Sequence, residues 1–153
     1  MWSDQQISEW QQKDADIKKI IVLKSMFQNK PAKQYVEGTS YSCRVLWSLL
    51  EVLTVLNNIL YYLFECENGD MNVLLIAPSE IRKQIMQHLH NARTAGHLGR
   101  DKTINSVKKR FFWSGMTSDI SQWCKACNSC AMAKSGPGLG KFPLQQSKVG
   151  APF

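Results

Sequence analysis

The stretches QHLHNARTAGHLG (residues 87–99) and WCKACNSC (residues 123–130) concentrate the metal-binding side chains of this chain. They hold all three of its histidines and three of its five cysteines. A structural zinc ion takes four ligands in a tetrahedral arrangement, drawn mainly from cysteine thiolates and neutral histidine nitrogens. His90 and His97 form one pair and Cys127 and Cys130 a second, with 29 residues between the pairs. This spacing predicts one zinc site that joins two segments distant in the sequence.

Both clusters contain one candidate ligand too many. His88 and His90 lie two positions apart, so on a helix they point to nearly opposite sides; His90 is preferred because it is closer to the following loop. Either adjacent pair of cysteines has the C-x2-C spacing, and Cys124 is a ligand, a spare thiol or a small core residue. The second pair is favoured, since a turn after the helix can aim both of its sulfurs at one point. An iron–sulfur cluster is less well supported, because its pattern requires a fourth cysteine where Lys134 stands.

The zinc ion is expected to close a bundle of three short helices. Apolar residues at helical spacing predict these helices at residues 80–91, 100–111 and 119–127. A bundle of this size has too small a core to be stable alone. Zinc binding contributes roughly 10–16 kcal/mol in small zinc peptides, which is enough to decide whether the bundle folds. Four protein ligands leave no open coordination position, so the site is interpreted as structural and not catalytic.

The preceding residues show a different pattern. The predicted elements there are helices at residues 3–12, 14–27 and 41–50 and strands at residues 53–56, 59–64 and 71–76. Asp14 is expected to cap the second helix, and Asn57–Asn58 to form the tight turn of a hairpin, since Asn tolerates positive φ. The predicted fold class is α+β: small N-terminal helices and a three-stranded antiparallel meander, followed by a zinc-stabilised three-helix bundle.

These predictions divide the chain into three parts. Residues 1–78 form an N-terminal extension of helices and a small sheet, and residues 79–134 form the zinc-binding domain. Residues 135–153 begin with a segment rich in glycine that is typical of a linker.

One apolar segment could be mistaken for a membrane span. Residues 45–64 are long enough to cross a bilayer, but Glu51 lies near their middle. A carboxylate at a bilayer centre costs roughly 2.5–3.5 kcal/mol on insertion scales. The segment is therefore predicted to be a buried part of the core.

The charge of the chain is divided unevenly. Residues 1–78 contain seven Lys and Arg against nine Asp and Glu, whereas residues 79–153 contain twelve against three. Such a concentration of cations indicates either a polyanionic partner, with nucleic acid as the first candidate, or a solvated surface. The N-terminus is polar, which gives no sign of a secretory signal. Together with the clustered cysteines, this favours an intracellular, reducing compartment.

Residues 89–134, LHNARTAGHLGRDKTINSVKKRFFWSGMTSDISQWCKACNSCAMAK, resemble a known family. They are similar to the HHCC zinc-binding domain of integrases from gypsy-type LTR retrotransposons, through LH, AGHLG, KT, RFFW, GM and the CxxC. Upstream, ISEWQQKDADI, LW and NNILYY are similar to the segment between the RNase H and integrase parts of Pol polyproteins. Downstream, FPLQQSKVGAPF looks like the linker that leads to the integrase catalytic core.

The resemblance implies one structural Zn²⁺ held by His90, His97, Cys127 and Cys130, with Cys124 at a position that is not a ligand. It implies a module that helps the integrase to multimerise and to bind the DNA ends of the element, and thus a location in the nucleus. The residues expected to contact phosphates are Lys102, Lys108, Lys109 and Arg110, followed by Lys125 and Lys134.

The resemblance also implies that this chain alone is not an enzyme. Integrases use an Asp-Asp-Glu triad, and the acids of residues 79–153 are Glu80, Asp101 and Asp119, which belong to the zinc module. A second hypothesis is a protein-interaction domain retained by a host, which would bind its partner through Phe112, Trp113 and Trp123.

Overall fold

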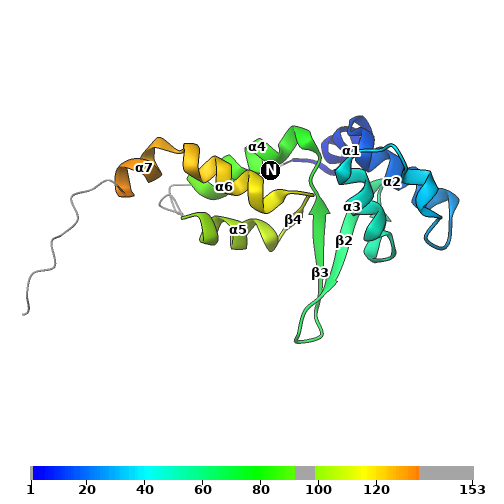
Figure 1. The fold of residues 1–153 in the computed structure, drawn as a ribbon. Coiled ribbons are helices and arrows are strands. Elements are labelled where there is room, and N and C mark those ends of the chain that lie inside the picture. Colours follow the sequence, from blue (N-terminus) through cyan, green and yellow to red (C-terminus); the bar gives the residue numbers. More distant parts are fainter. Residues whose placement is uncertain (1, 92–98, 135–153) are drawn as a thin grey trace, which may run out of the picture.

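The computed structural model describes residues 2–91 and 99–134, in which helices flank a small sheet (Figure 1). The α-helices are α1 (Asp4–Lys13), α2 (Ala15–Met26), α3 (Tyr41–Ser48), α4 (Ser79–Asn91), α5 (Arg100–Lys108), α6 (Met116–Ala126) and α7 (Asn128–Lys134). The strands are β1 (Leu53–Leu56), β2 (Ile59–Glu65), β3 (Met71–Ile76) and β4 (Phe111–Phe112), and the 3-10 turns are η1 (Lys33–Val36) and η2 (Leu50–Val52). The mixture of helices and sheet predicted from the sequence is confirmed.

Several local features predicted for the N-terminal part are confirmed, although the helix predicted for residues 41–50 ends at Ser48. Asp14 caps α2, because its Oδ1 accepts hydrogen bonds from the backbone N–H groups of Asp16 and Ile17. The turn between β1 and β2 has φ of 50° at Asn57 and 61° at Asn58, the left-handed region in which asparagine is tolerated. β1, β2 and β3 form the expected antiparallel meander.

The sheet differs from the prediction by one strand. β4 pairs in parallel with β3, with Leu75 opposite Phe111 and Ile76 opposite Phe112, so the sheet has the order β1-β2-β3-β4. The helix predicted to reach residue 111 ends instead at Lys108. In a strand, successive side chains point to opposite faces. Phe111 and Phe112 can therefore each pack on a different side of the sheet, which adjacent residues of a helix could not do.

One further boundary of the zinc module was predicted wrongly, and one short helix was not predicted. The third helix, α6, begins at Met116 and not at residue 119, directly after Gly115 in the left-handed conformation (φ 79°). A short helix, α7, follows Cys127 where only a turn was expected.

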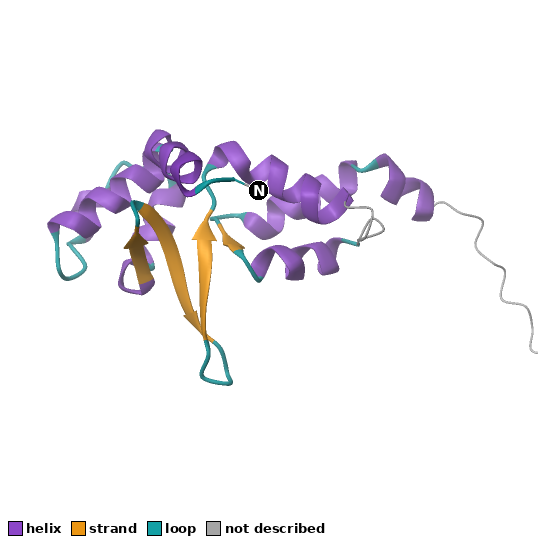
Figure 2. Cartoon of the chain, turned by 180° about the vertical axis from the view of Figure 1, so that it is seen from behind, coloured by secondary structure: helices purple, strands orange, loops and turns teal. Residues whose placement is uncertain are grey.

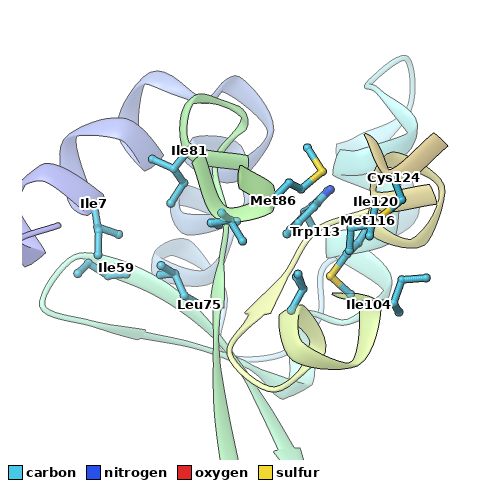
Figure 3. Packing of buried hydrophobic residues seen from close by; sticks show 13 residues of the cluster. Ile7, Ile59, Leu75, Ile81, Met86, Ile104, Trp113, Met116, Ile120 and Cys124 are labelled. Carbon is cyan, nitrogen blue, oxygen red and sulfur yellow. The ribbon is translucent and has the colours of Figure 1, made fainter. Parts of the chain in front are cut away.

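The sheet separates two hydrophobic cores. One face supplies Ile59 and Leu75 to a core that also contains Ile7 of α1 and Trp113. The other face packs against α2 and α3; its core residues are Ile17, Ile20, Leu23, Val36, Cys43, Leu46, Leu50, Leu53, Leu60 and Ile76. Figure 3 shows the first core, in which residues from α1, β2 and β3 share one cluster with residues from α4, α5 and α6.

The N-terminal helices are joined to the later elements by polar contacts, of which those of Gln11 are buried. Gln11 of α1 is fully buried; its Nε2 donates to the carbonyls of Leu60 (3.1 Å) and Ile76 (2.8 Å), and its Oε1 accepts from the Leu60 N–H (2.7 Å). The Oδ2 of Asp14 accepts from the Ser79 N–H at the start of α4 (3.0 Å). The boundary predicted at residue 78 falls at this junction and stays a prediction.

Residues 45–64 form the end of α3, then η2, β1 and most of β2. Among the described residues, no helix is both long enough and apolar enough to span a bilayer.

Candidate metal centre

The last turn of α4 places His90 inside the protein. Ile81, Ile85 and Met86 bury one face of this helix, and His90 continues that face with no exposed surface. His88 lies on the solvent side and is exposed, as predicted from its two-residue offset. His90 is therefore the histidine of α4 that is positioned to bind a metal.

The two cysteines are brought to His90 by the junction of α6 and α7. Cys127 ends α6 in an extended conformation, and its carbonyl accepts from the Ala131 N–H (3.0 Å), which opens α7. The backbone N–H of Cys130 donates to the Cys127 sulfur, which lowers the pKa of the Cys127 thiol, while burial acts in the opposite direction. A lowered thiol pKa favours the thiolate, which is the form that binds metal.

The three side chains fit a zinc ion. One ligand atom from each of His90, Cys127 and Cys130 lies within 4.8 Å of the others, and His90 Nε2 is 3.2 Å from Cys130 Sγ. With zinc bonds near 2.0–2.3 Å, the ligand atoms of a tetrahedral site are about 3.3–3.8 Å apart. Two sulfurs and one imidazole nitrogen are also the ligand types that zinc prefers. This is the one group of three or more His, Cys, Asp or Glu ligands found in the described part of the chain.

Thr103 orients the imidazole of His90. Its hydroxyl donates to the carbonyl of Gly99 (3.1 Å) and lies 3.2 Å from His90 Nδ1. A hydroxyl that already donates must accept from Nδ1–H, so the proton stays on Nδ1 and the lone pair on Nε2 faces Cys130. Hydrogen bonding of this kind around a ligating histidine is typical of zinc sites.

Thr103 was not recognised from the sequence as part of the site. It is fully buried, on the inner face of α5 with Ile104 and Val107. The available signal was a polar residue among the apolar positions of a helix that starts just after the histidine loop.

Cys124, like Thr103, lies on the Nδ1 side of the imidazole, away from Cys130. It is buried, and its Sγ is 3.6 Å from His90 Nδ1, whereas Cys130 faces Nε2. His97 lies outside the described residues, so its position as a ligand stays a prediction.

The predicted phosphate contacts lie on the surface. Lys102, Lys108, Lys109, Arg110 and Lys125 are exposed. The side chain of Lys134 is outside the described part of the chain. Among the residues the structure describes, the single ion pair joins Arg100 and Asp101, so none of these five cations is neutralised by a carboxylate in this way.

The aromatic residues of the second hypothesis belong mainly to the cores. Trp113 is only 2% exposed, and its indole Nε1 donates to Asp119 Oδ2 (2.7 Å). Phe112 and Trp123 are partly buried, and each packs against one of the two cores. The three do not form an exposed apolar patch.

Comparison with known proteins supports the metal centre. Residues 77–136 match the family described as the integrase zinc binding domain. A Macaca fascicularis protein titled "Gypsy retrotransposon integrase-like protein 1" is 30% identical over 69 residues, which are 45% of this chain and 13% of that protein. The Homo sapiens protein of the same title is 31% identical over 64 residues, 42% of this chain and 12% of its own length. The matched segment thus spans about an eighth of these relatives. No solved structure matches the chain.

Proposed function

We propose that residues 77–136, which match the integrase zinc binding domain family, form an HHCC module of the gypsy retrotransposon type that binds DNA and assembles integrase subunits. Zinc is the cofactor of this module. Its role is structural: it ties the end of α4 to the junction of α6 and α7. The proposal includes His97 as the fourth ligand and the nucleus as the location.

The cluster of His90, Cys127 and Cys130 is the observation that supports the proposal most directly. The donor atoms are close enough to share one ion, and Thr103 presents the correct nitrogen of His90. Purified chain should contain one zinc per molecule by elemental analysis. Replacing His97 with Ala should abolish tight zinc binding, as should Cys127→Ser. Full zinc occupancy in the His97→Ala variant would remove His97 from the ligand set.

DNA binding is inferred from the exposed cations of α5 and its C-terminal end. Lys102, Lys108 and Lys109 are exposed there, while Thr103, Ile104 and Val107 face the core. Contacts of such side chains with phosphates release counterions, so affinity falls as salt is added. They position a protein on DNA without reading its sequence.

This inference is tested by fluorescence anisotropy with duplex DNA at several salt concentrations. The triple variant K102E/K108E/K109E should bind more weakly, and the slope of log K against log salt should fall by about 0.9 for each lost contact. The matched control is K18E/K19E/K33E, which changes the net charge equally at exposed lysines of the N-terminal part. Equal losses of DNA affinity in both variants would show that only the net charge matters. A DNA affinity that does not depend on salt would favour a protein-interaction role.

The proposal assigns no catalytic residue to this chain. Asp119 accepts a hydrogen bond from Trp113, and Asp101 is paired with Arg100, so both acids have structural partners. Strand-transfer assays with magnesium and model DNA ends should therefore give no product. Magnesium-dependent product formation would contradict this part of the proposal.

A further inference from the structure

The β2–β3 hairpin extends away from the helices and forms an acidic, apolar arm (residues 63–73; Figures 1 and 2). In the arm these strands pair only with each other, because β1 reaches no further than Tyr62 and β4 pairs only with Leu75 and Ile76. Its exposed apolar side chains are Phe64 (46% exposed), Met71 (57%) and Val73 (49%). Its charged residues are Glu65, Glu67 and Asp70, with no Lys or Arg.

An apolar groove with a cation at its edge lies on the same face of the sheet as α1. Its volume is about 910 Å³, and it is bounded by α1, α4 and the paired ends of β3 and β4. Trp2, Leu75 and Phe111 are among its apolar lining residues, and Trp2 donates a hydrogen bond from its Nε1 to Gln84 Oε1 (3.0 Å). The residues that line it are Trp2, Asp4, Ile7, Leu75, Gln84, Ile85, Gln87, His88, Leu89, Arg110 and Phe111.

The arm and the groove are complementary in charge. Arg110 lines the groove, and the exposed Lys108 and Lys109 precede it in the sequence. Asp4 is the acid among the lining residues. Within the described ranges, the acids of the arm and these three cations form no ion pairs, since the single pair is Arg100–Asp101. An exposed apolar surface next to unpaired charge is typical of a binding surface.

The arm cannot fill the groove of its own molecule. β3 runs without a break from Met71 in the arm to Leu75 in the groove, and the strand directs the arm away from that surface. The occupant must therefore come from another molecule. A second copy of this chain supplies an acidic, apolar arm to each basic, apolar groove, and the exchange can be reciprocal, as in a two-fold symmetric dimer.

We propose that the arm of one copy docks in the groove of a second copy. Met71 and Val73, which share one face of the hairpin with Glu65, then lie against the apolar surface, and the acids of the arm lie near Arg110. The inference rests on the subunit assembly proposed above and names the surfaces that make it. It predicts association that weakens with salt, because exposed charges of opposite sign are brought together.

Sedimentation velocity of the zinc-loaded chain over a range of concentrations tests this pairing. The arm variant E65K/E67K should dissociate at least about tenfold more readily than wild type, because like charges then meet at the groove. The control E37K/E51K changes the net charge equally at exposed acids outside the arm, and it should associate like wild type. The groove variant H88E/R110E should also be weakened.

A mixture of the two weakened variants gives the sharpest result. In a mixed dimer, each reversed arm meets a reversed groove and each native arm meets a native groove. E65K/E67K and H88E/R110E should therefore associate with each other more tightly than either does with itself. Wild-type association of the arm variant, or failure of the mixture to associate, would overturn the inference. If the wild-type chain stays monomeric, both the docking and the proposed assembly are overturned. If it associates but shows no salt-dependent DNA binding, only the proposed DNA binding is overturned.

Discussion

The chemistry of the metal centre depends on which nitrogen of His90 faces the two thiolates. Thr103 determines this, because its hydroxyl donates to the Gly99 carbonyl and can therefore only accept from Nδ1–H. Nε2 is left as the nitrogen directed toward Cys130. The imidazole is fully buried, so the surrounding packing restricts its rotation, and the contact with Thr103 sets which nitrogen faces the thiolates.

Replacing Thr103 with Val should weaken zinc binding by roughly 10- to 100-fold, the usual effect of removing a hydrogen bond from a ligating histidine. The shape of the side chain is retained, so the core around Ile104 should remain packed. Thr103→Ser keeps the hydroxyl and should bind zinc nearly as well as wild type. Competition with a chromophoric chelator measures both affinities, and equal affinities for Val and wild type would contradict this role.

Cys124 should be dispensable for the metal, because it faces Nδ1 of His90 and not Nε2. Cys124→Ala should retain one zinc per chain and lose some stability from the smaller side chain in the core. Cys130→Ser should lose zinc under the same conditions. Elemental analysis after dialysis separates the two cases; a zinc-free Cys124→Ala protein that remains folded would make Cys124 a ligand.

Among the elements, α1 is held to the sheet by one buried side chain. Gln11 satisfies the Leu60 N–H and contacts the carbonyls of Leu60 and Ile76, groups that would otherwise be buried without these partners. Gln11→Ala should lower the free energy of unfolding by about 1–3 kcal/mol or more, the cost of an unsatisfied buried polar group. The exposed neighbour is the control: Gln12→Ala should change it by less than about 0.5 kcal/mol. Urea denaturation measures both, and similar effects would show that Gln11 adds little.

The β1–β2 turn gives a second test at the level of elements. Asn57 and Asn58 both have positive φ, which costs a residue with a Cβ about 1–2 kcal/mol and asparagine less. Asn58→Val should therefore destabilise the protein by about 1 kcal/mol or more. Asn58→Gly should leave the stability unchanged or raise it. Glycine adopts positive φ without cost, and this gain offsets the stability lost because glycine is freer in the unfolded chain. A valine variant as stable as wild type in thermal unfolding would contradict the turn geometry.

In the whole molecule, one sheet contributes residues to two cores, and its fourth strand comes from the zinc module. β4 pairs with β3, and the core around Trp113 includes Ile7, Ile59 and Leu75 of the N-terminal part. A change that destabilises the zinc module should therefore also destabilise the N-terminal helices. Removal of zinc with a chelator should lower the melting temperature, since zinc stabilises only the folded state. Circular dichroism and tryptophan fluorescence should report one coincident transition. Two separate transitions would mean that residues 1–78 fold independently.

Local features were predictable from the sequence because neighbouring residues create them. The cap by Asp14 and the turn at Asn57–Asn58 depend on backbone preferences that a few residues express alone. His90 could be preferred over His88 because a helical period assigns them to different sides. The spacing of the cysteines likewise predicted a metal site before the helices around it were known.

Other features depend on partners that the sequence does not place side by side. Phe111–Phe112 became a strand because β3 offered an open edge and each face of the sheet had a core to receive one ring, which overrode the helical pattern before them. Thr103 joined the metal centre only because α5 packs beside the end of α4. Backbone preference and spacing act over a few residues, whereas strand pairing and burial depend on which distant segments meet in the folded chain.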